Sequence, residues 1–244
     1  SDIVKQGNEY YISSAKGFRT LNFSKNTIVP VPGFSSINGG TNVIIKLNDQ
    51  ELLLGTTDGL YIVKSKTKQF FNYKIPSATQ NKDPGNIIMN VYADKKDIVW
   101  IGQWGDFLSS FDTKSKTFSF YQPLLQNALK RENVNLSIVP ANNDSILLVS
   151  DLYHGVFLFN SKTGKPVKHL VVPGRKAVDY NSCFVDKSNG IWLATSNGVF
   201  VMDPLKQIIT THQLMPPDSP PQSQRGSVFS ISERKDNSPS PVAW

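Results

Sequence analysis

The sequence predicts an all-β protein built from repeated antiparallel sheets, and three observations carry this prediction. Residues 191–203 form two short apolar runs around a Ser-Asn-Gly turn, which is the pattern of a β-hairpin. Imperfect copies of this hairpin recur along the chain. No segment has the apolar period of a helix, apart from a short candidate at 123–132.

The copies recur at a nearly constant interval. Those at 11–22 and 53–64 match without gaps, whereas those at 100–112 and 148–160 have one extra residue in the turn. The equivalent turn positions are 17, 59, 107, 155 and 198, so the spacings are 42, 48, 48 and 43 residues. This is the period of a four-stranded β-propeller blade.

Each hairpin is flanked by two further strand candidates. An apolar run precedes it, for example at 42–45, and a polar turn followed by an aromatic-rich run comes after it, for example at 69–73. Together they make a four-stranded meander. We expect one propeller domain or fragment over residues 1–244, with blades at about 1–40, 41–85, 86–133, 134–179 and 180–225 and a partial sixth at 226–244.

About five blades are fewer than a common ring contains, which indicates a piece of a larger propeller. The alternative is a five-bladed ring closed by its overlapping ends. The chain has 39% hydrophobic and only 18% charged residues, so it is expected to fold. No apolar run approaches the length of a membrane helix, so we expect no membrane insertion within this segment.

The composition argues against several kinds of chemistry. The single cysteine, Cys183, excludes an intramolecular disulfide and lies in an apolar run, where a buried structural thiol is expected. The three histidines form no motif with the spacing of zinc ligands, so we expect no metal site and no cofactor. No phosphate loop or nucleophile elbow is present, and no catalytic residue is assigned.

The net charge of +7 comes largely from lysines in the turn that follows each hairpin. These turns share one face of a propeller. Solvated turns that discourage edge pairing are the simpler interpretation, and attraction to an acidic surface is the other. We expect no nucleic-acid partner, because neither a groove-reading motif nor a stacking platform accompanies the charge.

Two copies also carry a specific resemblance. Residues 186–199 (DKSNGIWLATSNGV) and 99–106 (VWIGQWGD) resemble the two-component regulator propeller repeat, and the resemblance covers nearly the whole chain. It implies a propeller in the periplasmic sensor region of a Bacteroidetes hybrid histidine kinase that responds to oligosaccharides. The implied place is the periplasm or the extracellular face of the inner membrane of a Gram-negative bacterium. Its implied partners are an oligosaccharide, the remaining blades and downstream domains of the same chain, and a second copy in a homodimer.

A ligand is expected where loops differ between blades. The longer hairpin turns and the connections between blades lie on the face opposite the lysines. Aromatic rings stack on sugars, while carboxylates, imidazoles and guanidinium groups bond hydroxyls. The candidate ligand-binding residues are therefore Trp104, Asp106, Asp151, Tyr153, His154, Arg131, Arg175 and Tyr180.

We therefore expect a non-catalytic, ligand-sensing propeller of a two-component sensor kinase, with any kinase activity residing elsewhere in the full-length protein. The alternative is a structural or docking propeller of a cell-surface or secretion-system accessory protein. A propeller lyase is a third and more remote class, because it requires a metal or an acid/base pair near the channel.

Overall fold

The computed structural model describes the following residues: 2–34, 40–76, 86–94, 96–104, 108–121, 136–141, 146–151, 155–172, 179–196, 198–203, 209–212, 228–233 and 239–243. These ranges contain β-strands and no helix, so the all-β prediction is confirmed. None of them contains a helix long and apolar enough to cross a membrane. The helix candidate at 123–132 lies outside the described residues.

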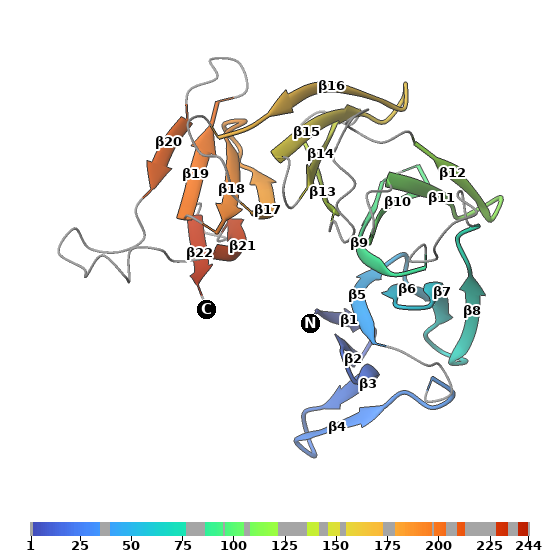
Figure 1. Cartoon of the computed structure of the whole chain (residues 1–244). Coiled ribbons are helices and arrows are strands. Elements are labelled where there is room, and N and C mark those ends of the chain that lie inside the picture. The colour runs from blue at the N-terminus through green and yellow to red at the C-terminus, as the bar shows by residue number, and fades with distance from the viewer. Residues whose placement is uncertain are drawn as a thin grey trace. The chain divides into compact units, whose positions relative to one another are not determined.

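The strands form five four-stranded antiparallel sheets and one two-stranded sheet, each with its strands in chain order (Figure 1). This is the meander expected of propeller blades. The chain's contacts divide it into two compact units. The first unit contains three blades, and the second contains two blades and the two-stranded sheet.

The twelve strands of the first unit follow one another in three meanders. They are β1 (Ile3–Gln6), β2 (Glu9–Ser14), β3 (Gly17–Asn22), β4 (Thr27–Pro30), β5 (Thr41–Lys46), β6 (Glu51–Thr56), β7 (Gly59–Lys64), β8 (Gln69–Tyr73), β9 (Ile88–Ala93), β10 (Ile98–Gln103), β11 (Leu108–Asp112) and β12 (Thr117–Phe120).

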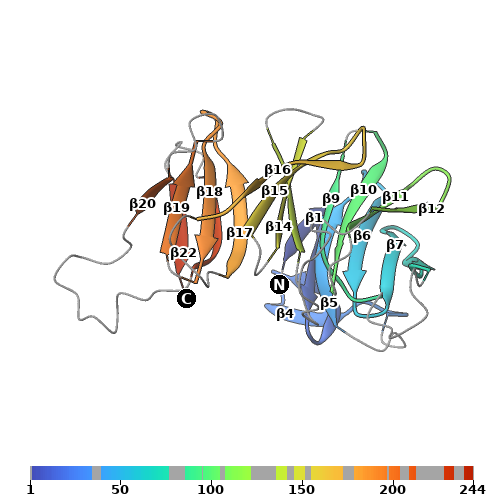
Figure 2. The ribbon, with the colours of Figure 1, turned by 45° about the horizontal axis from the view of Figure 1, so that its top comes forward.

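The second unit repeats the pattern, and Figure 2 shows β17, β18 and β19 lying side by side. Its strands are β13 (Leu136–Pro140), β14 (Ile146–Asp151), β15 (Gly155–Asn160), β16 (Lys165–Leu170), β17 (Tyr180–Val185), β18 (Ile191–Thr195), β19 (Gly198–Met202), β20 (Ile209–His212), β21 (Val228–Glu233) and β22 (Pro239–Ala243).

The core lies between the faces of neighbouring blades. In the first unit, Tyr11 and Phe18 of the first blade pack with Leu52 and Leu54 of the second. The opposite face of the second blade packs on the third through a cluster that includes Leu53 and Phe111. Alternating residues of β6 therefore belong to different interfaces, because successive side chains of a strand point to opposite faces. The second blade is therefore buried on both faces.

Hydroxyl groups and glycines close the hairpins that define the repeat. The Oγ1 of Thr56 donates to the carbonyl oxygen of Gly59 at 2.9 Å, and Thr195 bonds Gly198 in the same way at 2.8 Å. Both glycines have positive φ, of 105° and 106°. The Gly turn predicted for residues 191–203 is confirmed, since β18 and β19 pair across it.

Cys183 occupies the core of the second unit and is 2% exposed, as predicted. Burial raises the pKa of its thiol to about 12, although a hydrogen bond with Ser150 opposes the shift. The thiol is therefore protonated at neutral pH, and its role is packing.

A single carboxylate organises the turn between β17 and β18. One oxygen of Asp186 accepts the backbone N–H groups of Ser188 and Gly190, each at 2.8 Å. The other oxygen accepts the indole N–H of Trp192 at 2.6 Å. The Asp and Trp of the repeat pattern, here Asp186 and Trp192, are therefore hydrogen-bonded to each other. This bond explains why six residues separate them in the sequence.

Replacing Asp186 with alanine is expected to lower the free energy of unfolding by about 2 kcal/mol, because three donors lose their acceptor. Urea unfolding followed by tryptophan fluorescence measures this change. The matched control is Ser188→Ala, which retains the backbone N–H that bonds the carboxylate and should cost less than about 0.5 kcal/mol. Equal losses in the two variants would show that the carboxylate does not organise the turn.

Candidate functional site

The structure describes the side chains of two of the eight candidate ligand-binding residues, Trp104 and Tyr180. Asp151 ends β14, and its side chain is not described. The remaining five lie outside the described residues: Asp106, Arg131, Tyr153, His154 and Arg175. Their role as ligand contacts stays a prediction.

Trp104 lies at the hairpin-turn end of the first unit. It follows β10 directly and is half-buried. Its backbone N–H donates to the carbonyl oxygen of Ile87 at 2.9 Å, while the N–H of Gly59 donates to the neighbouring carbonyl of Asn86 at 2.8 Å. Segment 86–87 therefore links the hairpin turn of the second blade to Trp104 of the third.

Polar side chains that the sequence analysis did not select surround this turn of the second blade. The Asp58 carboxylate pairs with the ammonium group of Lys74 at 2.8 Å and accepts a hydrogen bond from the Tyr61 hydroxyl at 3.3 Å. Asn72 donates to the same hydroxyl. Burial raises the pKa of Tyr61, and the charge of Asp58 adds to this effect. Only the fold places the Asp58-Gly59 turn beside Asn72 and Lys74, so the sequence alone does not mark this cluster.

Tyr180 has a different position from the one expected. It is 6% exposed and belongs to the core of the second unit. Its hydroxyl accepts the backbone N–H of Val172 at 2.9 Å, while burial raises its pKa. The ring thus fixes the segment that follows β16, and we do not carry it into the proposed ligand site.

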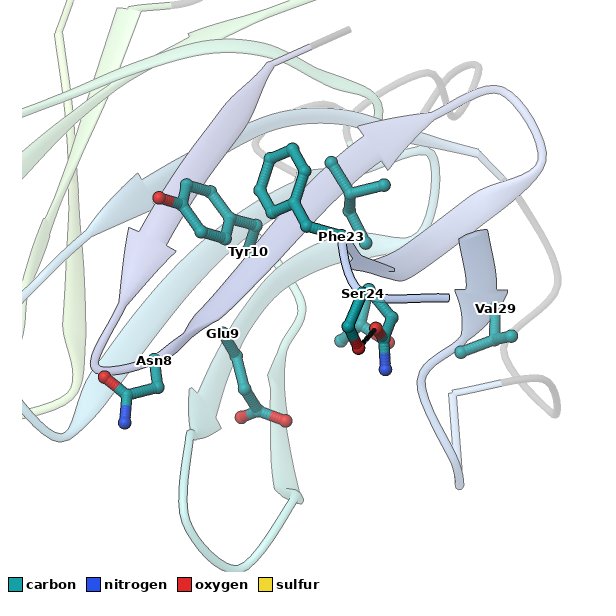
Figure 3. A pocket seen from close by; sticks show the side chains of 9 residues that line it. Asn8, Glu9, Tyr10, Phe23, Ser24 and Val29 are labelled. Atoms are coloured by element: carbon teal, nitrogen blue, oxygen red, sulfur yellow. Dashed lines mark hydrogen bonds between the residues drawn. The ribbon is translucent and has the colours of Figure 1, made fainter. Parts of the chain in front are cut away.

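The first blade carries a groove among its described residues. Its volume is about 400 Å³, near the lower end of the range for small-molecule pockets. It lies by the β1–β2 and β3–β4 turns, the end of the blade opposite the hairpin turn. In Figure 3, Tyr10 and Phe23 lie together above Asn8 and Glu9. Its lining residues are Asn8, Glu9, Tyr10, Thr20, Leu21, Asn22, Phe23, Ser24 and Val29, and we call it the first-blade groove.

The turn lysines at this end are mostly exposed, as the solvated-turn interpretation expects. Lys114 pairs with Asp97 at 2.5 Å, and both side chains are exposed, so the pair contributes little to stability. Lys68 differs, because its side chain is only 26% exposed and its ammonium group contacts Glu9 at 2.5 Å. Among the described residues, no three His, Cys, Asp or Glu side chains gather as a metal site would require.

The repeated four-stranded meanders define the chain as a β-propeller protein. No protein-family model matches the sequence, and no curated protein matches it either. Solved structures do share its fold. The extracellular domain of BT4673 from B. thetaiotaomicron, assigned to a hybrid two-component system, has a TM-score of 0.73 and 16% identity over 100% of this chain and 30% of its own.

The extracellular domain of BT3049 from the same organism, also assigned to a hybrid two-component system, has a TM-score of 0.74 and 17% identity over 99% of this chain and 32% of its own. The computationally designed protein Ika8 has a TM-score of 0.64 and 14% identity over 99% of this chain and 70% of its own. At these identities the likeness shows the fold. The chain spans about a third of the length of the two bacterial domains.

Proposed function

We propose that this chain is the ligand-sensing propeller of an extracytoplasmic two-component receptor, and that it binds an oligosaccharide without transforming it. The observation that carries the proposal is the fold, which is similar over 99–100% of the chain to extracellular domains of two such systems. The designed protein of similar fold shows why the fold needs support from a site.

The hairpin-turn end of the first unit supplies such support. Trp104 offers an aromatic ring, and Asp58, Asn72 and Lys74 offer hydrogen-bonding groups one blade away. Half-exposed rings with polar side chains around them suit a polyhydroxylated ligand, because the ring stacks while the polar groups bond hydroxyls. Asp106 follows Trp104 by two residues and remains a candidate contact.

The proposal predicts that the chain binds at least one oligosaccharide in a panel of neutral and acidic hexasaccharides, measured by isothermal titration calorimetry. Trp104→Ala should weaken that binding by about fivefold, since an aromatic contact contributes about 1 kcal/mol. Phe71→Ala is the control, because Phe71 is a 42% exposed aromatic on β8 whose side chain points to the face of the strand opposite that of Asn72.

Two further readouts separate the sensor from other classes. Chromatography of the bound oligosaccharide should recover it uncleaved, as expected of a non-catalytic site. The reading frame of the gene should continue into a membrane span and a histidine kinase. A frame without a kinase, together with no binding to any member of the panel, would contradict the sensor and favour a docking propeller.

A further inference from the structure

The first blade packs on the second blade through one face of its sheet. Tyr11 and Phe18 point to that face. Tyr10 and Ile12 point to the other face, because successive side chains of a strand alternate. Strand pairing extends this other face across β1, β3 and β4, and no described blade of the first unit lies on it. We call it the outer face, and it is defined by Ile3, Lys5, Tyr10, Ile12, Arg19, Leu21 and Ile28.

The second blade shows what covers the equivalent face elsewhere in the repeat. With the hairpin turns of the two blades aligned, Ile12 is equivalent to Leu54. Ile3 pairs with Ile12 as Ile44 pairs with Leu54, so Ile3 and Ile44 are equivalent too. Ile44 is 2% exposed beneath the first blade, whereas Ile3 is 61% exposed. Three further second-blade residues at positions equivalent to outer-face residues are buried in the same interface: Leu52, Tyr61 and Val63.

The outer face leaves large apolar side chains in solvent. Ile28 is 52% exposed, in addition to Ile3. Phe23 is 66% exposed and extends the apolar surface through an edge-to-face contact with Tyr10, with ring centroids 4.7 Å apart. Neighbouring apolar groups that remain exposed together are typical of an interaction surface.

The charges of the outer face indicate which partner fits it. Lys5 and Arg19 are cationic, and none of the residues that define the face carries a carboxylate. The Nε atom of Arg19 is buried and has no hydrogen-bond partner among the described residues. A guanidinium group in an apolar face needs an acceptor, and a carboxylate suits it best. Two copies of the outer face pressed together would instead oppose cation to cation, which argues against a second copy as the partner.

We propose that the outer face docks a further propeller blade of the same polypeptide, with an apolar sheet face over Ile3 and Ile28 and a carboxylate that pairs with Arg19. A blade fits this face because the first blade itself covers the equivalent residues of the second. The chain covers 30% and 32% of two solved extracellular domains of similar fold, so such domains contain further chain that can supply a blade. The inference concerns the assembly of the domain and does not depend on an oligosaccharide ligand.

Cysteine labelling tests the proposal, because Cys183 is 2% exposed and an introduced surface thiol is then the reactive one. Ile3→Cys is compared with the control Lys66→Cys, which lies in the exposed turn after β7. In the 244-residue chain a maleimide should label both variants at similar rates. In the complete extracytoplasmic domain that the gene encodes, the Ile3→Cys thiol should react more slowly by about tenfold or more, and the Lys66→Cys rate should not change.

Arg19→Glu tests the paired carboxylate. In the complete domain the reversed charge would face that carboxylate, so this change should restore fast labelling of the Ile3→Cys thiol. Arg19→Lys is the control, because it keeps the positive charge and should keep most of the protection. The urea midpoint of the 244-residue chain should be the same with Arg19→Glu as without it, which shows that the first blade still folds.

Four results would overturn the proposal or its ion pair. Equal labelling of the Ile3→Cys and Lys66→Cys variants in the complete domain would mean that no blade covers the outer face. Protection in the 244-residue chain that rises with protein concentration would assign the face to a second copy. Protection there at every concentration would mean that the chain's own blades cover it. Protection in the complete domain that Arg19→Glu leaves intact would remove the carboxylate.

Discussion

Replacing Phe111 with alanine is expected to lower the free energy of unfolding by about 4 kcal/mol, because it removes a fully buried ring from a core that cannot close around the space. Phe111 is 0% exposed on β11 and packs in the interface between the second and third blades. Its ring centroid lies 4.9 Å from that of Tyr73 and 4.8 Å from that of Phe118. The variant therefore loses two aromatic contacts in addition to buried area.

Equilibrium urea unfolding followed by tryptophan fluorescence measures the loss, since Trp100 lies in the same blade. Phe120→Ala is the matched control, because Phe120 ends the neighbouring strand β12 and is 42% exposed. It should cost less than about 1 kcal/mol. Similar losses in the two variants would mean that the face between the blades is not the main source of stability in this unit.

The repeat made the fold predictable from sequence. A hairpin such as residues 191–203 would be ambiguous alone, but several copies at one period require a structure that buries the same faces repeatedly. The repeat also accounts for the positive φ of Gly59 and Gly198, which lie in its hairpin turns, and for the burial of Cys183, which lies in one of its strands. Local turn chemistry and alternation agree with the global arrangement, so each supports the other.

Individual contacts were less predictable than strands. Tyr180 sits at the junction of a connection and a strand, and sequence alone does not reveal whether such a residue faces solvent or core. Its 6% exposure reflects packing in the second unit, including Val156 and Leu170. The alternation of side chains along a strand tells which residues share a face. Whether the first residue of the strand is buried depends on how the neighbouring blade packs against it.

The sequence analysis placed the candidate ligand residues on the face opposite the turn lysines and did not select the residues of the first-blade groove. Ser65, Thr113 and Ser161 begin the turns after the third strands of the second, third and fourth blades, whereas Phe23 stands there in the first blade and Pro204 in the fifth. The repeat shows what the blades share, whereas a ligand site depends on loops that differ between blades. The pairing of Lys68 with Glu9 could not be foreseen, because it joins residues of different blades.

Gly155→Ala is expected to be nearly as damaging as the loss of Phe111, at about 3–4 kcal/mol, for two separate reasons. Gly155 begins β15 with a φ of 107°, a conformation that side chains rarely adopt. A Cβ atom added there would also overlap the carbonyl oxygen of Leu170 and come within 3.0 Å of Val171 Cγ1. Backbone atoms of a paired segment cannot move aside as the end of a flexible side chain can.

Gly7→Ala separates the two reasons. Gly7 also has a positive φ, of 61°, but a Cβ added there meets nothing within 4 Å. This variant should lose only the conformational part, about 1 kcal/mol. The difference between the two variants in urea unfolding therefore measures the steric part at Gly155. Equal losses would show that β15 and β16 can move apart without cost, and the close approach of Gly155 to Leu170 would then be wrong.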